Sequence, residues 1–179
     1  MQAQDVLHFW FQEVTEKQRF AKNDALDATL SKRFGATLQA AVRGELSDWR
    51  ATAAGSLAEI VVLDQFSRNL YRDTPAAFAQ DPQALTLAQV LVASGQDQML
   101  DTVQRSFAYM PYMHSESLWV HAQALPLFTQ PGLENTLAFE QRHQIIIAQF
   151  SRYPHRNAIL GRQSTTEELT FLALPGSSF

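Results

Sequence analysis

The stretch DALDATLSKRFGATLQAAVR, residues 24–43, decides the fold class. An apolar residue stands at every fourth position within it: Leu26, Leu30, Phe34, Leu38 and Val42. This spacing puts the apolar side chains on one face of an α-helix. Gly44 follows directly, and glycine commonly ends a helix because it adopts the left-handed backbone conformation without strain. The stretch therefore predicts a helix over residues 24–43.

Apolar residues recur at steps of three and four along the rest of the chain, and almost no segment alternates between apolar and polar residues as a half-buried strand does. The chain is therefore predicted to be all-α. Short connections predict stacked antiparallel helical hairpins in a single helical domain over residues 1–179. Further helices are expected at residues 5–14, 47–69, 82–95, 97–109, 118–128, 133–152 and 165–172.

Polar residues and prolines suit the ends of several of these helices. Asp97 and Ser115 are predicted N-cap residues. Ser115 in that role would place Glu116 in the first turn of the next helix, where a carboxylate is stabilised. Residues 165–168, TTEE, have the spacing of a capping box. Pro111 is expected to terminate the helix before it.

The tetrapeptide Gln-Phe-Ser-Arg occurs twice, at residues 65–68 and 149–152. A match of four residues can arise by chance. The alternative is a duplicated helical hairpin, as in solenoid repeats, which would place Arg68 and Arg152 in equivalent positions. The sequence leaves both readings open.

The composition excludes several functional classes. The chain has 179 residues, no cysteine and a net charge of −4. Thiol catalysis, iron–sulfur clusters and cysteine zinc sites are therefore excluded. An acidic chain also lacks the bulk positive charge with which proteins bind nucleic acid. Neither a glycine-rich phosphate loop nor a glycine-flanked nucleophilic serine is present, so no cofactor is predicted.

The first residues, MQAQD, are polar and acidic, unlike the basic start of a secretory signal, and the apolar run VLHFWF that follows is short. No window of about 18 consecutive apolar residues exists. We therefore expect a cytoplasmic protein without a membrane-spanning segment.

The first candidate site is QFSRYPHRN, residues 149–157. Arg152, His155, Arg156 and Asn157 crowd the end of the most apolar predicted helix. The planar fork of arginine suits a carboxylate or phosphate, and histidine donates a hydrogen bond or moves a proton. The structural alternative is that the arginines bond the free carbonyl groups at the helix C-terminus.

The second candidate is DQFSRNLYR, residues 64–72. Asp64 and Arg68 are four residues apart and share one helix face. One reading is an exposed ion pair of little energetic weight. The functional reading makes Arg68 a ligand clamp oriented by Asp64, with Asn69 beside it.

The third candidate is RSFAYMPYMHSE, residues 105–116. His114 and Glu116 are predicted to act as a general base and its orienting acid, and Arg105 as a further ligand contact. A divalent metal held together with His143 or His155 is the other possibility. No recognised ligand spacing is present, so no metal site is predicted.

Two other histidines have structural readings. His143 lies near Phe139, Ile146 and Ile147 and is predicted to be a buried or boundary histidine with a hydrogen-bond partner. His121 is predicted to lie on a helix surface.

Several stretches together carry a resemblance to one known family: VLHFWF (6–11), LDQFSRN (63–69), Tyr71 and Arg72, TPAAFA (74–79), Arg105, YMP (109–111), HSE (114–116), His143, RYPHRN (152–157), LGR (160–162), Ser164 and Thr165, and GSSF (176–179). In these stretches the chain resembles the bacterial domain-of-unknown-function 924 family. The resemblance implies a tetratricopeptide-like helical fold. It transfers no reaction, because the family has no established activity. Its motifs coincide with the three candidate stretches, which favours one shared site over separate helix caps.

The chain departs from the family in two places. The segment between Phe11 and Asp24 is less typical, so a contribution of that loop to a site is not expected. Ser151 stands where the family usually has glycine, which predicts a local change of the backbone beside Arg152.

We expect the candidate residues to converge in one cleft between helix ends. The arginines would hold a small anionic molecule, and a histidine or carboxylate would transfer a proton, as in a hydrolase or lyase. The alternative is a non-catalytic helical-repeat module that binds a peptide or protein partner. The catalytic candidates are His114, Glu116 and His155, and the ligand-binding candidates are Asp64, Arg68, Asn69, Arg105, Arg152, Arg156 and Asn157.

The distribution of arginine supports the anion hypothesis. Lysine occurs only as Lys17, Lys22 and Lys32, and seven of the ten arginines after Lys32 lie in or beside the three candidate stretches. Arginine is planar and permanently charged. The sequence therefore predicts a small anion as ligand rather than a nucleic-acid backbone.

Overall fold

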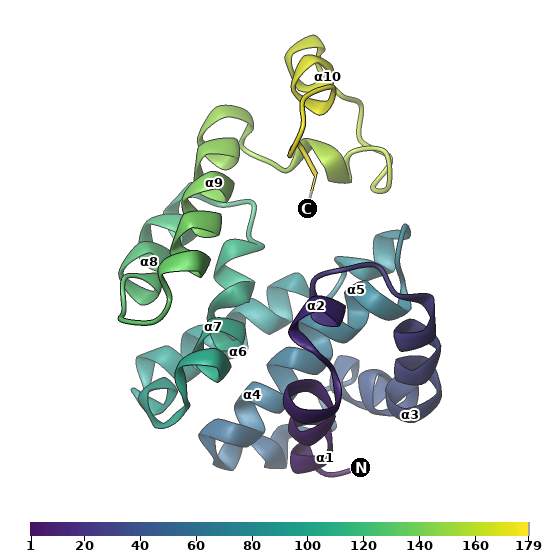
Figure 1. Ribbon diagram of the computed structural model, residues 1–179, viewed down its shortest axis with the longest axis vertical. Helices are drawn as coiled ribbons and strands as arrows, with labels where there is room; N and C mark the ends of the chain where they lie inside the picture. The colour runs from purple at the N-terminus through teal and green to yellow at the C-terminus, as the bar shows by residue number, and fades with distance from the viewer. Residues whose placement is uncertain (179) are drawn as a thin grey trace. The chain divides into compact units, whose positions relative to one another are not determined.

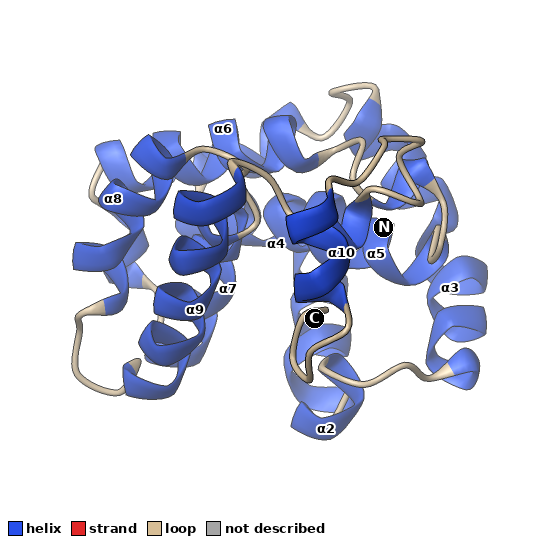
Figure 2. Ribbon diagram, turned by 90° about the horizontal axis from the view of Figure 1, so that it is seen from above, coloured by secondary structure: helices blue, strands red, loops and turns tan. Residues whose placement is uncertain are grey.

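The computed structural model describes residues 1–178, and every regular element in that range is helical (Figure 2), which confirms the all-α prediction. Phe179, the last residue of the family resemblance, lies outside this range. Short 3-10 helices cover Ser47–Ala51, Pro75–Ala77, Gln96–Met99 and Pro154–Arg156, and π-helical turns cover Phe9–Glu13 and Val62–Phe66. The α-helices are α1 (Ala3–His8), α2 (Glu16–Arg19), α3 (Asp24–Val42), α4 (Ala53–Val61), α5 (Ser67–Leu70), α6 (Asp81–Ala93), α7 (Thr102–Met113), α8 (Leu118–Phe128), α9 (Glu134–Phe150) and α10 (Thr166–Leu172).

The chain forms two compact units, and each is described by itself. Unit 1 comprises Met1–Arg72 and Ala76–Pro111, and unit 2 comprises Asp73–Pro75 and the chain from Tyr112 onward. Helix α7 crosses from one unit to the other near its C-terminal end. The single domain and the tetratricopeptide-like stack of hairpins stay predictions.

Unit 1 is built around α4, against which α1 and α6 both pack. α4 continues through the π-helical turn Val62–Phe66 into α5. Phe66 of this turn makes ring contacts with Phe9, Trp10 and Phe34. These aromatic side chains are buried, so they form part of the core of unit 1.

Helix α3 matches its prediction closely. It begins after Asn23, whose side chain accepts a hydrogen bond from the N–H of Leu26, and it ends at Val42. Gly44 has a φ of 73°, and its N–H donates to the carbonyl group of Ala41. Glycine suits this position because a Cβ atom would strain the left-handed backbone.

The helix expected from residue 47 begins instead at Ala53, with Thr52 as N-cap. The side chain of Thr52 accepts a hydrogen bond from the N–H of Gly55. Residues 47–51 form a separate 3-10 helix before it. The predicted start is wrong because apolar residues continue from the 3-10 helix into α4, so their spacing does not show that a new helix begins after Thr52.

Two other predicted helix ends are also wrong. Asp97 does not cap α7, because that helix begins only at Thr102. The Asp97 carboxylate is instead buried and accepts a 2.5 Å hydrogen bond from the Tyr109 hydroxyl. Pro111 does not terminate α7, which runs to Met113. Pro111 lies inside the helix, where it has no N–H to donate to the carbonyl group of Phe107, and the helix continues for two residues beyond it.

Unit 2 contains the hairpin of α8 and α9, which lie side by side in Figures 1 and 2. Ile146 and Ile147 of α9 pack with Tyr153, which follows α9. Phe150 and Phe171 pack against this cluster and join the end of α9 to α10. Tyr153 thus anchors the first candidate stretch in the core of unit 2.

Helix α9 ends in an unusual way. Ser151 has a φ of 58°, in the left-handed region where the family usually places glycine. Ser67, its counterpart in the other Gln-Phe-Ser-Arg sequence, is helical with a φ of −59°. Arg68 therefore continues a helix whereas Arg152 leaves one, so the two copies do not have equivalent local structure.

Candidate functional site

Asp64 and Arg68 form a partly buried ion pair in unit 1. Asp64 lies in a π-helical turn with no exposed surface, and such turns are frequent at functional sites. Arg68 Nη1 lies 3.0 Å from Asp64 Oδ1, and Arg68 Nη2 lies 3.0 Å from a carboxylate oxygen of Asp81. The exposed-pair reading is wrong, because Asp64 is buried. Asp64 does orient Arg68, and the ligand role of both residues stays a prediction.

Asn69 has a different partner from its neighbour Arg68. Its amide donates a 2.7 Å hydrogen bond to Asp27 of α3. Arg72 donates to the two oxygens of the same carboxylate at 3.0 and 3.1 Å. These bonds hold α5 against α3.

Arg105 of α7 belongs to a third polar group in unit 1. Its guanidinium donates to Gln98 Oε1 at 3.2 Å and to Thr102 Oγ1 at 3.4 Å. Gln98 in turn donates to Asp97 at 2.7 Å, beside the Tyr109 hydroxyl. The predicted residues of unit 1 are thus distributed over separate groups.

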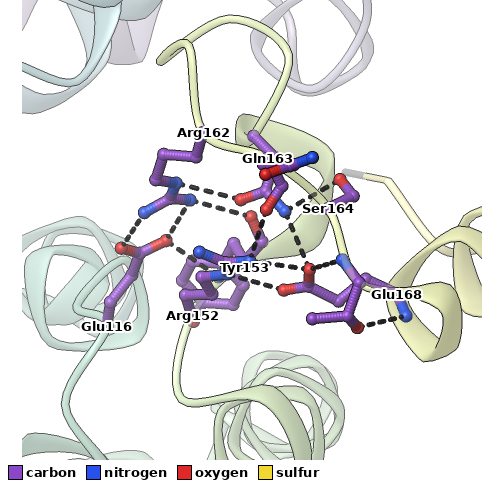
Figure 3. Close-up of polar contacts among 9 residues, drawn as sticks. Glu116, Arg152, Tyr153, Arg162, Gln163, Ser164 and Glu168 are labelled. Carbon is purple, nitrogen blue, oxygen red and sulfur yellow. Dashed lines mark hydrogen bonds and ion pairs between the residues drawn. The ribbon is translucent and has the colours of Figure 1, made fainter.

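Glu116 and Arg162 begin a chain of polar contacts in unit 2 (Figure 3). Both oxygens of Glu116 accept from Arg162, at 2.6 and 2.9 Å, and Oε1 also accepts from the backbone N–H of Tyr153 at 2.8 Å. Ser115 does not cap α8, because the N-cap is Ser117 and Glu116 precedes the helix. The capping prediction for this segment is therefore wrong.

The chain of contacts continues to α10. Arg162 Nε donates to Asn157 Oδ1 at 2.9 Å, and Asn157 Nδ2 donates to Glu168 Oε2 at 3.2 Å. Glu168 accepts two hydrogen bonds from Arg152, at 2.6 and 2.7 Å. The backbone N–H of Glu168 also donates to the side chain of Thr165, so the predicted capping box is confirmed. Arg152 thus finds its partners in and before α10 (Figure 3).

Both carboxylates of this network have lowered pKa values. Burial by itself raises the pKa of Glu116, but hydrogen bonds from Arg162 and the Tyr153 N–H and the nearby positive charges outweigh it. The Arg152 hydrogen bonds, opposed by burial, lower the pKa of Glu168 to about 2. Both side chains are therefore ionised at neutral pH, so the network holds charge rather than supplying a proton.

Histidines and an arginine surround Tyr153. The ring centroids of His143 and His155 each lie 5.7 Å from that of Tyr153. The guanidinium of Arg156 lies 4.6 Å from the same ring centroid, and it donates a 3.1 Å hydrogen bond to the carbonyl oxygen of His114. Arg156 is buried, whereas His114 and His155 are half-buried. The structure thus groups three of the predicted site residues: His114, His155 and Arg156.

His143 is buried with a hydrogen-bond partner, as predicted. Its Nδ1 lies 2.7 Å from the carbonyl oxygen of Phe139, which can only accept. Burial and the positive charges of the neighbouring histidines together lower the pKa of His143 to about 3, although the Phe139 bond opposes them. His143 is therefore neutral at neutral pH.

The prediction that His121 lies on a helix surface is wrong. His121 has no exposed surface, and its Nδ1 lies 2.6 Å from Oε1 of Glu140, which is equally buried. The signal was present in the spacing, because His121 stands three and seven residues before the buried Ala124 and Phe128. Glu140 likewise precedes His143 by three residues on the buried face of α9. Sequence reasoning also missed Tyr153 and the pairing of Arg162 with Glu116.

A hollow of about 440 Å³ lies in unit 2 between the end of α9 and the start of α10. Arg152, Glu167 and Glu168 supply its charged groups. Two carboxylates beside one arginine, itself already paired with Glu168, make this hollow an unfavourable place for an anion.

In the part of the chain that the structure describes, no group of three or more histidine, cysteine, aspartate or glutamate residues is arranged to hold a metal ion. None of the described helices is both long and apolar enough to cross a membrane. The predicted site residues fall in both units, so their convergence in one cleft stays a prediction.

The chain belongs to the family described as bacterial protein of unknown function (DUF924), whose model matches residues 6–176. It is similar to a solved structure of a protein of unknown function from Agrobacterium tumefaciens, with 36% sequence identity and a TM-score of 0.91 over 96% of each chain. No curated protein matches it. The family is thereby shown, and an activity is not.

Proposed function

We propose that this chain, as a member of that family, binds a small anionic molecule through Arg156, His114 and His155 of unit 2. The observation that carries the proposal is a buried guanidinium that lies against Tyr153 beside the ring of the half-buried His155 and donates to the backbone carbonyl oxygen of His114. A guanidinium fork matches the oxygens of a carboxylate or phosphate, and stacking on an aromatic ring fixes its plane.

The polar network beside this group serves as its frame. Glu116 accepts from the N–H of Tyr153 and is itself held by Arg162. Asn157 and Arg152 connect the same segment to Glu168 of α10. These contacts fix the backbone on both sides of His155 and Arg156, which is what a preorganised binding site requires.

A histidine beside a bound anion also permits proton transfer. Imidazole is the side chain best suited to exchange a proton near neutral pH. In this proposal Arg156 holds the anion, and His114 or His155 takes a proton from water or from the bound molecule, as a hydrolase or lyase requires. Glu116 is ionised and paired, so it positions rather than transfers.

Anion binding is tested by the melting temperature of the protein with inorganic phosphate, pyrophosphate and citrate. A ligand at a hundred times its Kd adds about 2.7 kcal/mol to the unfolding free energy, which raises Tm by about 5 °C or more. Arg156→Lys should abolish the shift, because lysine lacks the bidentate fork. Arg142→Lys, an exposed position on α9, is the matched control and should keep it.

The proposal fails if none of the three anions raises Tm. It also fails if Arg156→Lys, melting at the wild-type temperature without ligand, responds to an anion as the wild type does.

A second candidate function is favoured by exposed apolar side chains on the α8–α9 hairpin. Trp119 and Ile145 are each 65% exposed, and Leu118 and Phe139 are 48% and 54% exposed. Surface groups of this kind often mark partner contacts. Selection from a displayed peptide library tests it: peptides that bind the wild type should lose affinity for Trp119→Ser but not for Val90→Ser, an equally exposed site in unit 1. Equal loss in both variants would contradict it.

A further inference from the structure

A buried hydrogen-bonded group in unit 2 has no part in the contacts proposed for the anion. Nδ1 of His121 lies 2.6 Å from Glu140 Oε1, and both side chains are 0% exposed. Nε2 of His121 lies 2.9 Å from the carbonyl oxygen of Ser115 and 3.1 Å from the hydroxyl oxygen of Tyr153. The hydroxyl of Tyr153 donates to the carbonyl oxygen of Met113.

These contacts determine where the protons lie. The carbonyl oxygen of Ser115 can only accept, so Nε2 of His121 carries a hydrogen. The Tyr153 hydroxyl has given its own hydrogen to Met113, so it accepts from the same Nε2. A proton also lies between Nδ1 and Glu140, either on the imidazole or on the carboxyl group. Both arrangements leave the pair with no net charge, so no uncompensated charge is buried.

Tyr153 connects this group to the proposed anion site. Its hydroxyl is fixed by His121 and Met113, and its ring lies 4.6 Å from the guanidinium of Arg156 and 5.7 Å from the ring of His155. Rotation or displacement of Tyr153 would move the surface against which both side chains rest. The buried pair lies on α8 and α9, rigid elements that suit a supporting role.

We infer that His121 and Glu140 are positioning residues of the anion site, acting on Arg156 and His155 through the hydroxyl and ring of Tyr153. The inference rests on the proposed function for its ligand. Glu140 fixes His121 in the form that carries a hydrogen on Nε2, and His121 fixes Tyr153. Substitutions that remove the bond between Glu140 and His121 should therefore weaken anion binding without any contact between Glu140 and the anion.

Three substitutions separate positioning from simple stabilisation. Glu140→Gln keeps a hydrogen-bond donor for Nδ1 of a neutral His121, so Nε2 retains its hydrogen. Glu140→Leu has similar volume and removes the bond. Tyr153→Phe keeps the ring beside Arg156 and removes only the hydroxyl.

The measurement is titration calorimetry with inorganic phosphate, made well below the melting temperature of each variant. Glu140→Leu and Tyr153→Phe should weaken phosphate binding about tenfold or more, and Glu140→Gln should stay within about threefold of the wild type. Equal losses in Glu140→Gln and Glu140→Leu, or wild-type affinity in all three variants, would overturn the inference. If Glu140→Leu does not fold, Tyr153→Phe decides alone.

A second readout needs no ligand. The ring current of Tyr153 shifts the side-chain NMR resonances of Arg156. This ring-current shift should persist in Glu140→Gln and be lost in Glu140→Leu. If it persists in Glu140→Leu, the positioning role is refuted whatever binds. If the wild type binds no phosphate while the resonances respond as expected, phosphate binding fails and the connection from Glu140 to Arg156 stands.

Discussion

Several arginine side chains of this protein form ion pairs with carboxylates of the same chain. Arg33 with Glu13, Arg50 with Glu59 and Arg152 with Glu168 each form two hydrogen bonds through the planar fork. The scarcity of lysine fits this use, because the lysine ammonium group has no such geometry. The concentration of arginine near the candidate stretches therefore has a structural cause beside the proposed binding of an anion.

The pair of Arg152 with Glu168 predicts a pH dependence of stability. The ordinary pKa of the glutamate is 4.5, and the Arg152 bonds lower the pKa to about 2 in the folded state. The pair therefore stabilises fully above pH 4.5, and the contribution disappears as the pH falls through about 2. Glu168→Gln should lower the unfolding free energy at pH 7 by about 1–3 kcal/mol.

Urea denaturation of the wild type and Glu168→Gln between pH 7 and 2 measures this contribution. The difference between them should shrink below pH 4.5. Glu167→Gln, the exposed neighbour, is the control and should differ from the wild type by about 0.5 kcal/mol or less. A difference that does not change with pH would show that the bond is not ionic.

His143 predicts a pH dependence of the same sign, over a range that begins at a higher pH. Its pKa falls from 6.5 to about 3 on folding, chiefly through burial. Between these pH values the unfolded chain binds a proton that the folded protein does not, so acid destabilises the fold. His143→Gln should make the unfolding free energy less dependent on pH by up to about 1.4 kcal/mol per pH unit in this range.

Chemical denaturation at several pH values between 7 and 3 gives the two slopes. Gln141→Asn, at an exposed position of α9 that carries no titratable group, is the control and should keep the wild-type slope. Equal slopes in the wild type and His143→Gln would mean that His143 is protonated in the fold.

Gly55 and Gly35 are both helical glycines, but the space around them differs. A Cβ atom at Gly55 would lie 1.9 Å from the backbone carbonyl oxygen of Trp49, whereas one at Gly35 in α3 would meet nothing within 4 Å. Gly55→Ala should therefore cost about 1–3 kcal/mol of unfolding free energy. Gly35→Ala should add about 0.5–1 kcal/mol, because alanine favours the helix.

Thermal or urea denaturation of the two variants measures both signs. The same substitution at two helical glycines separates helix propensity from steric exclusion. Stabilisation by Gly55→Ala would show that the segment 49–55 relaxes without cost.

Helix interiors were predictable from the sequence, and several helix ends were not. The four-residue spacing from Leu26 to Val42 identifies α3 because periodicity is a local property. The start of α4 depends on the hydrogen bond from the N–H of Gly55 to the side chain of Thr52. Asp97 caps no α-helix, and its carboxylate accepts a hydrogen bond from the hydroxyl of Tyr109, twelve residues away. The first depends on a local side-chain cap and the second on a tertiary contact, and the apolar spacing contains neither.

The candidate site shows the same division. The polar stretches were recognised by residue type, and His114, His155 and Arg156 do lie together in unit 2. The partner of Glu116 is 46 residues away and the partner of His121 is 19 residues away. Pairing over such separations is set by how α8, α9 and α10 pack, so the sequence supplied the residues and not the network.

The division of the chain into two compact units raises the question of whether they unfold together or separately. Unit 2 has only about 70 residues, and a single core of that size rarely supplies more than about 3–5 kcal/mol without a staple. The chain has no cysteine, and unit 2 buries polar groups such as His121 and Glu140. We therefore expect unit 2 not to persist once unit 1 unfolds, as the single-domain prediction requires.

Native-state hydrogen exchange of wild type and Gly55→Ala tests this expectation. Gly55 lies in unit 1, so local destabilisation alone would lower the protection only of unit 1 amides, such as that of Leu57 in α4. If the chain unfolds as one cooperative body, the amides of Ile146 and Ile147 in α9 should lose the same opening free energy as Leu57. Unchanged protection in α9 beside a loss in α4 would show that unit 2 is stable by itself, and that the chain contains two domains.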